Sequence, residues 1–441
     1  MRNIVIKNFR CYENKSIEFR SGINLLIGDN SVGKTSLLRA CNLVLNSFFS
    51  GYSDENTTWK SADNDDFRNT GIAELPVEIS FNFGSWDFQK IESPSGSIIE
   101  LDLDGEYKIE KKSKKNSRNI VTGLSALKEY ASLLQKHSHE IVDGEIRQNH
   151  ALPLYACFST EDIHTVRKFD KNKFKKHQPK PSFGYFESYD CKGLMECWIK
   201  RLLVLKEAKI GEEEINNVRN AIIDALGPDG CNVIDDMEIR YNDGNVYFHY
   251  IDGRTAAADL LSDGYRRLIN IVMDIAFRSA LLNKAMYGDQ SYKHTNGTVI
   301  IDEIDEHLHP ALQVCILKAL QMTFPKIQFI VSTHSPLVIS SVETRPENVV
   351  YKLEYSDGIY SHKEINAYGL DSNLILEEKV GVLSRVPLID SKLKLSLDYI
   401  SKRKLDDAKR EIDELEKLTD PNQPELVKLR AILNRIEAIG V

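Results

Sequence analysis

The sequence predicts an α/β fold with a largely parallel central sheet, a helical insertion and a helical tail. Three observations predict it. A nearly continuous apolar run, Gly22 to Ile27, leads into a glycine-rich loop and then into a helical pattern. Two further apolar runs, Gly297–Ile301 and Ile327–Val331, flank the helical stretch Pro310–Met322, which is the spacing of a βαβ unit. Between these regions the pattern changes to charged loops and helices.

Composition places the chain among folded globular proteins. Of its 441 residues, 42% are hydrophobic and 28% are charged, which excludes disordered and collagen-like chains. No apolar stretch reaches the ~18 residues that a membrane span needs, and the first residues lack the apolar core of a signal peptide. We therefore expect a cytoplasmic protein without a membrane partner. Seven cysteines without a CxxC pair predict reduced packing residues, not disulfides or a zinc module.

The first part of the core is assigned to residues 1–93. Short alternating runs at Ile4–Phe9 and Ser16–Phe19 predict a strand pair, and helical spacing predicts a helix at Ser36–Leu45. Alternation at Leu75–Phe83 predicts that the sheet resumes there.

Residues 94–253 are interpreted as a mainly helical insertion. Its helical stretches are Gly123–Leu134, Leu194–Leu205 and Glu212–Leu226. A compact apolar run at residues 152–158 predicts a strand that returns to the main sheet. Asp243-Gly244, between two alternating runs, predicts a hairpin turn.

The second part of the core, residues 254–369, opens with the apolar helical pattern Leu268–Leu282 and contains the βαβ unit. Residues 370–441 show four helical patterns, broken by a turn at 419–423. We expect a helical tail that docks a partner or supports oligomerisation.

The strongest motif is the loop at residues 28–35, which matches G-x-x-x-x-G-K-T between a buried strand and a helix. Such a loop turns its backbone N–H groups around a phosphate, and the helix N-terminus adds positive potential. We expect Lys34 to reach the β- and γ-phosphates of ATP and Thr35 to offer a hydroxyl to Mg²⁺.

Two strand ends carry further chemistry. Asp302 and Glu303 follow the apolar strand near residue 300, at the sheet edge where open α/β sheets bind ligands. We expect Asp302 on the magnesium side and Glu303 as the candidate base for an attacking water. His334 follows the next strand, where it can donate to the γ-phosphate.

A fourth piece precedes the apolar helix. Ser262 can donate its hydroxyl to an anion, and Gly264 admits the close approach of a phosphate. The same residues taken alone are those of an ordinary helix cap.

These four pieces, in this order, resemble the ATP-binding-cassette ATPases of the SMC and RecF type. The segments that are similar to prokaryotic ATPases accompanying nucleases in phage defence, such as those of Septu and retron systems, are GDNSVGKTSLLRA, LLSDGYRRLINIVMDIAFR, VIIDEIDEHLHPALQ and FPKIQFIVSTHSPLVISS. The residues around Ser262 and Gly264 correspond to the signature motif of this class. They depart from the motif of the transporters at Asp263, where glycine is usual, and at Tyr265, where glutamine is usual. The resemblance covers residues 1–50 and 255–345 and implies an ABC-type P-loop ATPase head whose head-to-tail dimer encloses ATP.

Carried over by position, the resemblance assigns each site residue a role. The ATP-binding residues are Gly28, Asn30, Ser31, Gly33, Lys34, Thr35 and Ser36, with Ser262 and Gly264 acting across the dimer; the metal-side residues are Thr35 and Asp302; the catalytic residues are Glu303, His334 and Lys34. The glutamine that contacts the metal in related ATPases has no assigned position, because neither Gln89 nor Gln148 has a persuasive context. His307 and His309 are assigned to a dimer-facing turn in preference to a metal site.

The resemblance implies a regulatory ATPase that controls a separate HNH-type nuclease. The tail is too short for a Toprim nuclease, so no nuclease activity is expected in this chain. Two alternatives remain open. One is a RecF-like DNA-repair ATPase that binds DNA through the basic stretches 108–118 and 167–180, although the net charge is −8. The other is a nucleotide-bound scaffold with little turnover.

Overall fold

The computed structural model of the chain describes residues 1–68, 75–83, 89–92, 98–101, 103, 105–115, 123–142, 145–160, 180–191, 194–380, 386–420 and 423–439. The chain forms two compact units, Met1–Ser372 and Asn373–Val441. The first unit contains all of the predicted site residues. Of the basic stretch 167–180, only Lys180 lies within the described residues.

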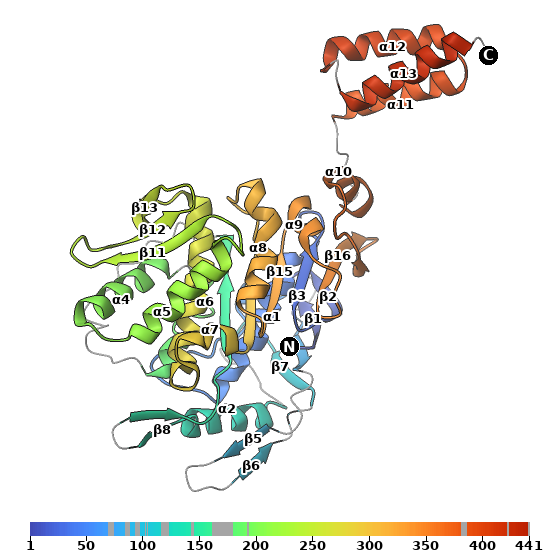
Figure 1. Ribbon diagram of the computed structural model, residues 1–441. Helices are drawn as coiled ribbons and strands as arrows, with labels where there is room; N and C mark the ends of the chain where they lie inside the picture. The colour runs from blue at the N-terminus through green and yellow to red at the C-terminus, as the bar shows by residue number, and fades with distance from the viewer. Residues whose placement is uncertain are drawn as a thin grey trace. The chain divides into compact units, whose positions relative to one another are not determined.

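A six-stranded sheet forms the centre of the first unit (Figure 1). Its strands lie in the order β10, β14, β15, β3, β16, β17, and only the last pair is antiparallel. Their bounds are β3 Ile23–Ile27, β10 Leu154–Phe158, β14 Gly297–Ile301, β15 Ile327–Ser332, β16 Val349–Ser356 and β17 Ile359–Ile365. β3 and β15 are buried at every position, as expected of strands covered on both faces. The predicted βαβ unit is confirmed, because β14 and β15 pair in parallel.

A four-stranded antiparallel sheet accompanies it, in the order β2, β1, β4, β7. Its strands are β1 Asn3–Phe9, β2 Tyr12–Glu18, β4 Val77–Asn82 and β7 Tyr107–Lys111. Helix α1, Lys34–Asn46, contacts strands of both sheets. β7 carries this sheet beyond residue 93, where the sequence predicts that the core gives way to the insertion. Its buried positions Tyr107, Ile109 and Lys111 alternate, but Ile109 and Lys111 lie inside the basic stretch 108–118, which reads as a charged loop.

Residues 89–257 contain the three predicted helices, the two strands of the predicted hairpin, and further short strands that the sequence did not predict. The helices are α2 Ser125–His137, α4 Met195–Ala208 and α5 Glu212–Leu226. The strands are β5 Gln89–Glu92, β6 Ile98–Leu101, β8 His139–Val142, β9 Glu145–Gln148, β11 Ile234–Arg240, β12 Asn245–Tyr250 and β13 Thr255–Ala257. The predicted hairpin joins β11 to β12 at Gly244, whose φ is 67°.

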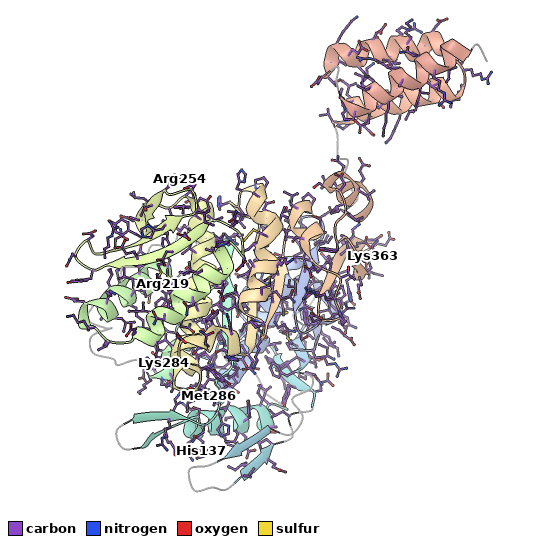
Figure 2. All side chains as sticks on the ribbon, viewed as in Figure 1. His137, Arg219, Arg254, Lys284, Met286 and Lys363 are labelled. Atoms are coloured by element: carbon purple, nitrogen blue, oxygen red, sulfur yellow. A yellow bond between two sulfur atoms is a disulfide. The ribbon has the colours of Figure 1, made fainter. Side chains whose placement is uncertain are left out.

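Charged side chains on the outside of the insertion pair with one another. Figure 2 labels Arg219 on α5 and Arg254 near β13. Arg219 pairs with Asp236 at 2.6 Å and Arg254 with Asp252 at 2.6 Å. These guanidinium groups therefore already have carboxylate partners within the chain.

Helix α6, Asp263–Tyr287, is buried along most of its length. The remaining helices of this part are α7 Ser291–His294, α8 Pro310–Thr323 and α9 Pro336–Ser341. Asp274, which interrupts the apolar run of α6, is buried but compensated: it accepts hydrogen bonds from Arg278 at 2.5 Å and from the Trp198 indole at 2.6 Å. Among the described helices, none is long and apolar enough to cross a membrane.

The cysteines depart from the sequence prediction. Two disulfides form, one between Cys157 and Cys191 and one between Cys231 and Cys315. The partners lie 34 and 84 residues apart in the sequence, so neither pair could be predicted from a local cysteine spacing. The expectation of reduced cysteines is wrong for these four residues.

The second unit is a three-helix bundle, in agreement with the predicted helical tail. Its helices are α11 Pro387–Ser401, α12 Leu405–Leu418 and α13 Pro424–Ile439. They pack around the core Leu393, Ile400, Ala408, Ile412, Leu415, Leu426, Leu429 and Leu433. The short helix α10, Ser372–Leu374, and a π-helical stretch, Ile375–Val380, precede the bundle.

Candidate nucleotide site

The glycine-rich loop lies between β3 and α1, as predicted. Gly28, Ser31 and Gly33 adopt positive φ angles of 142°, 71° and 95°. A Cβ atom at Gly28 would lie 2.5 Å from the Leu353 carbonyl oxygen, and one at Gly33 would collide with the Tyr12 hydroxyl. Both glycines are therefore required by the backbone and by their neighbours. Asn30 and Ser31 are exposed at the rim of the loop, and Ser36 is half-buried.

Lys34 is the first residue of α1, and its side chain folds back over the loop. Its Nζ atom donates hydrogen bonds to the carbonyl oxygens of Gly28 at 2.8 Å and Asp29 at 3.0 Å. Burial lowers the pKa of Lys34, and the carboxylates of Glu303 and Asp302 oppose this effect. A buried amine whose hydrogen bonds go to backbone carbonyl oxygens can exchange them for the oxygens of an anionic ligand.

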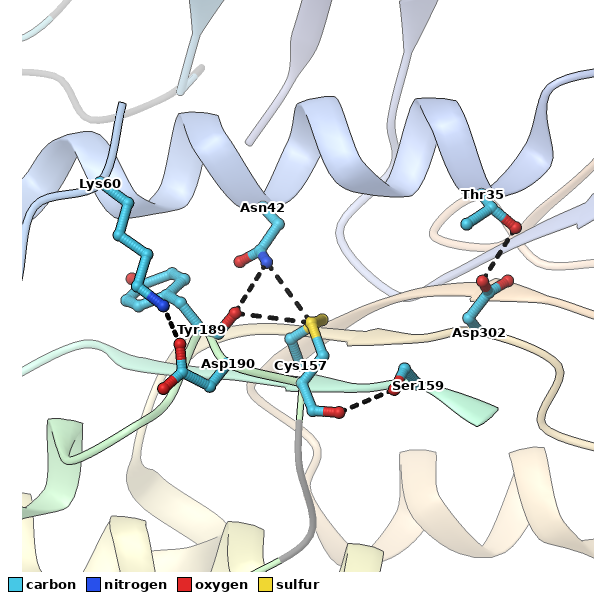
Figure 3. Close-up of a disulfide and its surroundings, with 9 residues drawn as sticks. Thr35, Asn42, Lys60, Cys157, Ser159, Tyr189, Asp190 and Asp302 are labelled. Atoms are coloured by element: carbon cyan, nitrogen blue, oxygen red, sulfur yellow. Dashed lines mark hydrogen bonds and ion pairs between the residues drawn. A yellow bond between two sulfur atoms is a disulfide. The ribbon is translucent and has the colours of Figure 1, made fainter. Parts of the chain in front are cut away.

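Thr35 brings the loop into contact with the end of β14. Its hydroxyl donates a 2.9 Å hydrogen bond to Asp302 Oδ2, which is drawn in Figure 3. The other carboxylate oxygen of Asp302 accepts a short hydrogen bond from the Ser332 hydroxyl at the end of β15. The predicted convergence of the loop and the paired acids is therefore present. A hydroxyl and a carboxylate at this spacing are oxygen ligands of the kind that Mg²⁺ prefers.

Glu303 and His334 lie together at the same sheet edge. The Glu303 Oε1 atom is 4.0 Å from His334 Nε2, and both side chains are more than a third exposed. Glu303 adopts a left-handed φ of 49°, and its backbone N–H donates to the Ser332 hydroxyl at 2.8 Å. Ser332 thus fixes both acids, a role that the sequence analysis missed. A carboxylate and an imidazole held close together at an exposed sheet edge can move a proton to or from water.

Arg267 is a second residue that the sequence analysis missed. It lies on α6, is 2% exposed, and its Nη2 atom donates to the carbonyl oxygens of Asp302 at 2.7 Å and Glu303 at 2.9 Å. Its Nη1 atom lies 3.2 Å from Glu306 Oε2. Arg267 therefore ties the helix that begins at the Ser262 motif to the acids of β14. In the sequence, only its place in the adjacent pair Arg266 and Arg267, just after the Ser262 motif, could have drawn attention to Arg267.

Ser262 and Gly264 lie at the start of α6. Ser262 occupies the N-cap position, but its exposed side chain makes no capping hydrogen bond. Gly264 is buried, and a Cβ atom there would lie 2.5 Å from the His307 carbonyl oxygen. The packing of Gly264 within its own chain thus provides a reason for glycine that the sequence analysis did not anticipate.

The remaining candidate residues have structural partners. His309 caps α8, because its Nδ1 atom accepts the Ala311 N–H at 3.3 Å. Gln148 is buried and donates to Leu282 O at 3.0 Å and to Asn283 Oδ1 at 2.7 Å. Among the described residues, no group of three or more His, Cys, Asp or Glu side chains forms a metal site.

The basic stretch at residues 108–118 is partly used within the fold. Lys108 pairs with Glu78 at 3.0 Å, and the buried Lys111 amine donates to the Ala62 carbonyl. Lys112 and Lys115 are exposed, and residues 116–118 lie outside the described residues. In the second stretch, Lys180 pairs with Glu55 at 2.8 Å.

Curated relatives carry the names that the predicted resemblance implies. The "Retron Vc95 probable ATPase" of Vibrio cholerae serotype O1 biovar El Tor is 25% identical over 451 residues, which cover 90% of this chain and 82% of that protein. The "Septu protein PtuA" of Bacillus mycoides (strain KBAB4) is 35% identical over 166 residues, which cover 36% of this chain and 22% of that protein. The chain thus spans most of the first relative and about a fifth of the second. The resemblance to the ATPases of retron and Septu systems is confirmed.

A solved structure with a similar arrangement is the SMC head bound to the C-winged helix domain of ScpA. It is 16% identical, has a TM-score of 0.46, and the match covers 83% of this chain and 98% of that one. The family described as the AAA ATPase domain matches residues 1–339, which include the loop, the paired acids and His334. Because this match covers well over half of the sequence, the chain belongs to the AAA ATPase domain family.

Proposed function

We propose that this chain binds ATP with Mg²⁺ at the loop of residues 28–35, hydrolyses it, and thereby regulates a separate nuclease. The observation that carries the proposal is the 2.9 Å hydrogen bond between Thr35 and Asp302, which joins two motifs 267 residues apart. Chance placement of two unrelated motifs does not bring a hydroxyl and a carboxylate to one point. The family match supports the nucleotide as ATP.

Phosphate binding follows from the loop. Its backbone N–H groups and the α1 N-terminus face the phosphates, and the Lys34 ammonium exchanges its two carbonyl partners for phosphate oxygens. Mg²⁺, held by Thr35 and Asp302, would neutralise part of the phosphate charge.

Hydrolysis is assigned to the pair at the sheet edge. Glu303 orients the attacking water and accepts its proton, and His334 donates a hydrogen bond to the γ-phosphate. Ser332 and Arg267 hold the backbone of this edge in place. Both side chains of the pair are open to solvent, so water reaches them.

A second copy of the chain completes the site. Ser262 is exposed with an unused hydroxyl at the start of α6, so it is free to donate to the γ-phosphate held by a head-to-tail partner. Gly264 keeps this turn tight against the His307 backbone. ATP binding would close the dimer, and hydrolysis would open it.

The regulated partner is proposed to be an HNH-type nuclease acting in cytoplasmic phage defence. The relatives named as retron and Septu proteins support a role in defence systems of these kinds, and the HNH type of the nuclease is what the sequence resemblance implies. The three-helix bundle supplies a separate unit for docking, and it exposes Leu388 and Leu418 at 55% each.

The test combines partner capture with phage challenge. The chain is co-expressed with the products of its neighbouring genes and purified, and cells carrying the set are challenged with phage. We expect an HNH nuclease in the complex, protection by the unchanged chain, and loss of protection with Glu303→Gln, whose hydrolysis rate falls ~100-fold or more while ATP still binds.

Glu354→Gln serves as the matched control, because Glu354 pairs with Lys352 and Lys363 on the β16–β17 hairpin. It should retain hydrolysis and protection. Recovery of a permease as the sole partner would contradict the nuclease assignment. A Glu303→Gln chain that hydrolyses ATP at the unchanged rate would contradict the catalytic one.

A further inference from the structure

We propose that the Cys157–Cys191 disulfide is a redox-modification site that controls the nucleotide site, and that a dithiol reductant acts on it. The inference rests on the proposed function. Both cysteines are only partly buried, so a dissolved reductant can reach them. In a reducing compartment, disulfides are typically transient or redox-sensing.

The first connection to the site runs through β10. Cys157 is the residue before the last in this strand and pairs in register with Ile300 of β14. The next residue, Phe158, accepts a 2.9 Å hydrogen bond from the Asp302 backbone N–H. A shift of Cys157 therefore moves the neighbouring Phe158 and, through its hydrogen bond, the backbone of Asp302.

The second connection runs through Ser159. Its hydroxyl donates a 2.7 Å hydrogen bond to the Cys191 carbonyl, as Figure 3 shows. Its own carbonyl accepts a 3.4 Å hydrogen bond from Arg267, which also binds the carbonyls of Asp302 and Glu303. Cys191 is thus connected to the backbone of both acids through Ser159 and Arg267.

The third connection reaches the phosphate-loop helix. The Asn42 amide on α1 donates to the Tyr189 carbonyl at 3.1 Å and to Cys191 Sγ at 3.4 Å. Asn42 follows Thr35 by seven residues, about two helical turns, so both project from one face of α1 toward the strands (Figure 3). The disulfide therefore lies between β10 and α1. Helix α1 carries Thr35, and β10 bonds to the backbone of Asp302, so the disulfide is connected to both members of the Thr35–Asp302 pair.

The redox step is a thiol–disulfide exchange. A thiolate of the reductant attacks one sulfur of the pair and forms a mixed disulfide, while the S–S bond breaks and the other cysteine leaves as a thiolate that then takes up a proton. The second thiol of the reductant then displaces the protein sulfur, forming a cyclic disulfide. Two electrons pass from the dithiol to the protein, and Cys157 and Cys191 end as thiols.

Reduction changes the local geometry without unfolding the segment. Bonded sulfurs lie ~2 Å apart, whereas unbonded heavy atoms rest at about 3.5–4 Å, so β10 and Cys191 must separate. The segment keeps its other anchors, because Arg278 donates to the carbonyls of Gly184 at 2.9 Å and Phe186 at 3.0 Å. The consequence is a displaced Asp302 and a weaker magnesium–nucleotide site.

Other cysteines provide the controls. Cys231–Cys315 joins the region after α5 to α8 and makes none of these contacts with the acids. Cys41 and Cys197 are buried free thiols, and burial raises the pKa of each, which keeps them protonated and poor nucleophiles.

The experiment compares the full chain after mild oxidation and after dithiothreitol, with the disulfide state verified by peptide mapping. Calorimetric titration with Mg-ATP reports affinity, and amide hydrogen exchange reports residues 297–306. We expect reduction to weaken Mg-ATP binding about 5-fold or more and to speed exchange in this segment. Cys157→Ser/Cys191→Ser should match the reduced protein in both buffers, whereas Cys231→Ser/Cys315→Ser should respond like the unchanged chain.

The two readouts separate this inference from the proposed function. Absence of Mg-ATP binding in both redox states contradicts the proposed function, and exchange at residues 297–306 then decides alone whether the disulfide acts on this edge. Equal affinity and equal exchange in the oxidised and reduced protein overturn the redox inference. Peptide mapping that finds no Cys157–Cys191 bond after oxidation overturns it as well.

Discussion

Two buried lysines of the first unit, Lys34 and Lys15, show how the groups around a buried amine affect its charge and its role. Lys34 has the carboxylates of Asp302 and Glu303 nearby, which favour its ammonium form against the effect of burial. Lys15 has uncharged partners, the Tyr360 carbonyl at 3.4 Å and the His362 ring at 3.0 Å. Burial lowers the pKa of Lys15 to about 8. The first lysine is suited to an anionic ligand, whereas the second is a charge that costs stability.

The pKa of Lys15 predicts how stability varies with pH. Below pH ~8 both the folded and the unfolded chain carry the proton. Between pH ~8 and the ordinary lysine pKa of ~10.4, the unfolded chain binds more protons, so stability rises with pH. From pH 7 to pH 10, the unchanged chain should gain about 1–2 kcal/mol relative to Lys15→Met, after discounting for residual solvation.

Urea titration followed by tryptophan fluorescence measures this gain, because Trp59 and Trp198 belong to the first unit. Lys363→Met is the control, since Lys363 is half-exposed and paired with Glu354 at 2.8 Å. The control should show the same pH dependence as the unchanged chain. A parallel pH dependence of Lys15→Met and the unchanged chain would show that Lys15 is protonated as an ordinary surface lysine.

At the scale of elements, Arg267 connects α6 to β14, because it donates hydrogen bonds to two carbonyl oxygens at the end of β14. Arg267→Lys keeps a positive charge but cannot reach both carbonyls from one planar group. We expect hydrolysis to fall about 10-fold, because Asp302 and Glu303 lose their alignment. Unsatisfied buried carbonyls should also lower the free energy of unfolding by ~1–3 kcal/mol.

Arg266→Lys is the matched control, one position earlier and half-buried. It should leave hydrolysis within about 2-fold of the unchanged chain. Steady-state hydrolysis and urea titration of both variants make the comparison. Equal loss in both variants would mean that Arg267 has no special connection to β14.

The elements around the site were predictable because each has a strong local pattern. β3, the loop and α1 follow from an apolar run, two glycines and helical spacing, and β14, α8 and β15 follow in the same way. Strands such as β9, with the sequence EIRQ, have no apolar alternation, and their pairing is decided by the opposite strand.

The residues missed at the site are those whose role depends on tertiary contacts. Ser332 and Arg267 contact the acids from other elements, across 30 and 35 residues of sequence. The disulfides were missed for the same reason, since pairing over 34 and 84 residues leaves no local trace. Lys34, Asp302 and His334 were found because motif position, without tertiary knowledge, marks them.

At the scale of the whole molecule, the account requires two copies of the chain to share each nucleotide. Ser262→Arg places a bulky cation where the partner's phosphates would meet the start of α6. We expect this variant to bind Mg-ATP normally as a monomer but to lose ATP-dependent dimerisation, because the arginine obstructs the interface. Sedimentation with Glu303→Gln as background keeps the ATP intact during the measurement.

The exposed Ser361 on β17 provides the control position. Ser361→Arg in the same background should still dimerise with ATP. Unchanged ATP-dependent dimerisation of Ser262→Arg would contradict the assignment of this residue to the shared site.

The most direct test of the account is calorimetric titration of the full chain with Mg-ATP, compared with Lys34→Ala. The account predicts saturable binding by the unchanged chain and a loss of affinity of at least ~10-fold in the variant. Failure of the unchanged chain to bind Mg-ATP, or equal affinity in the two proteins, would contradict it.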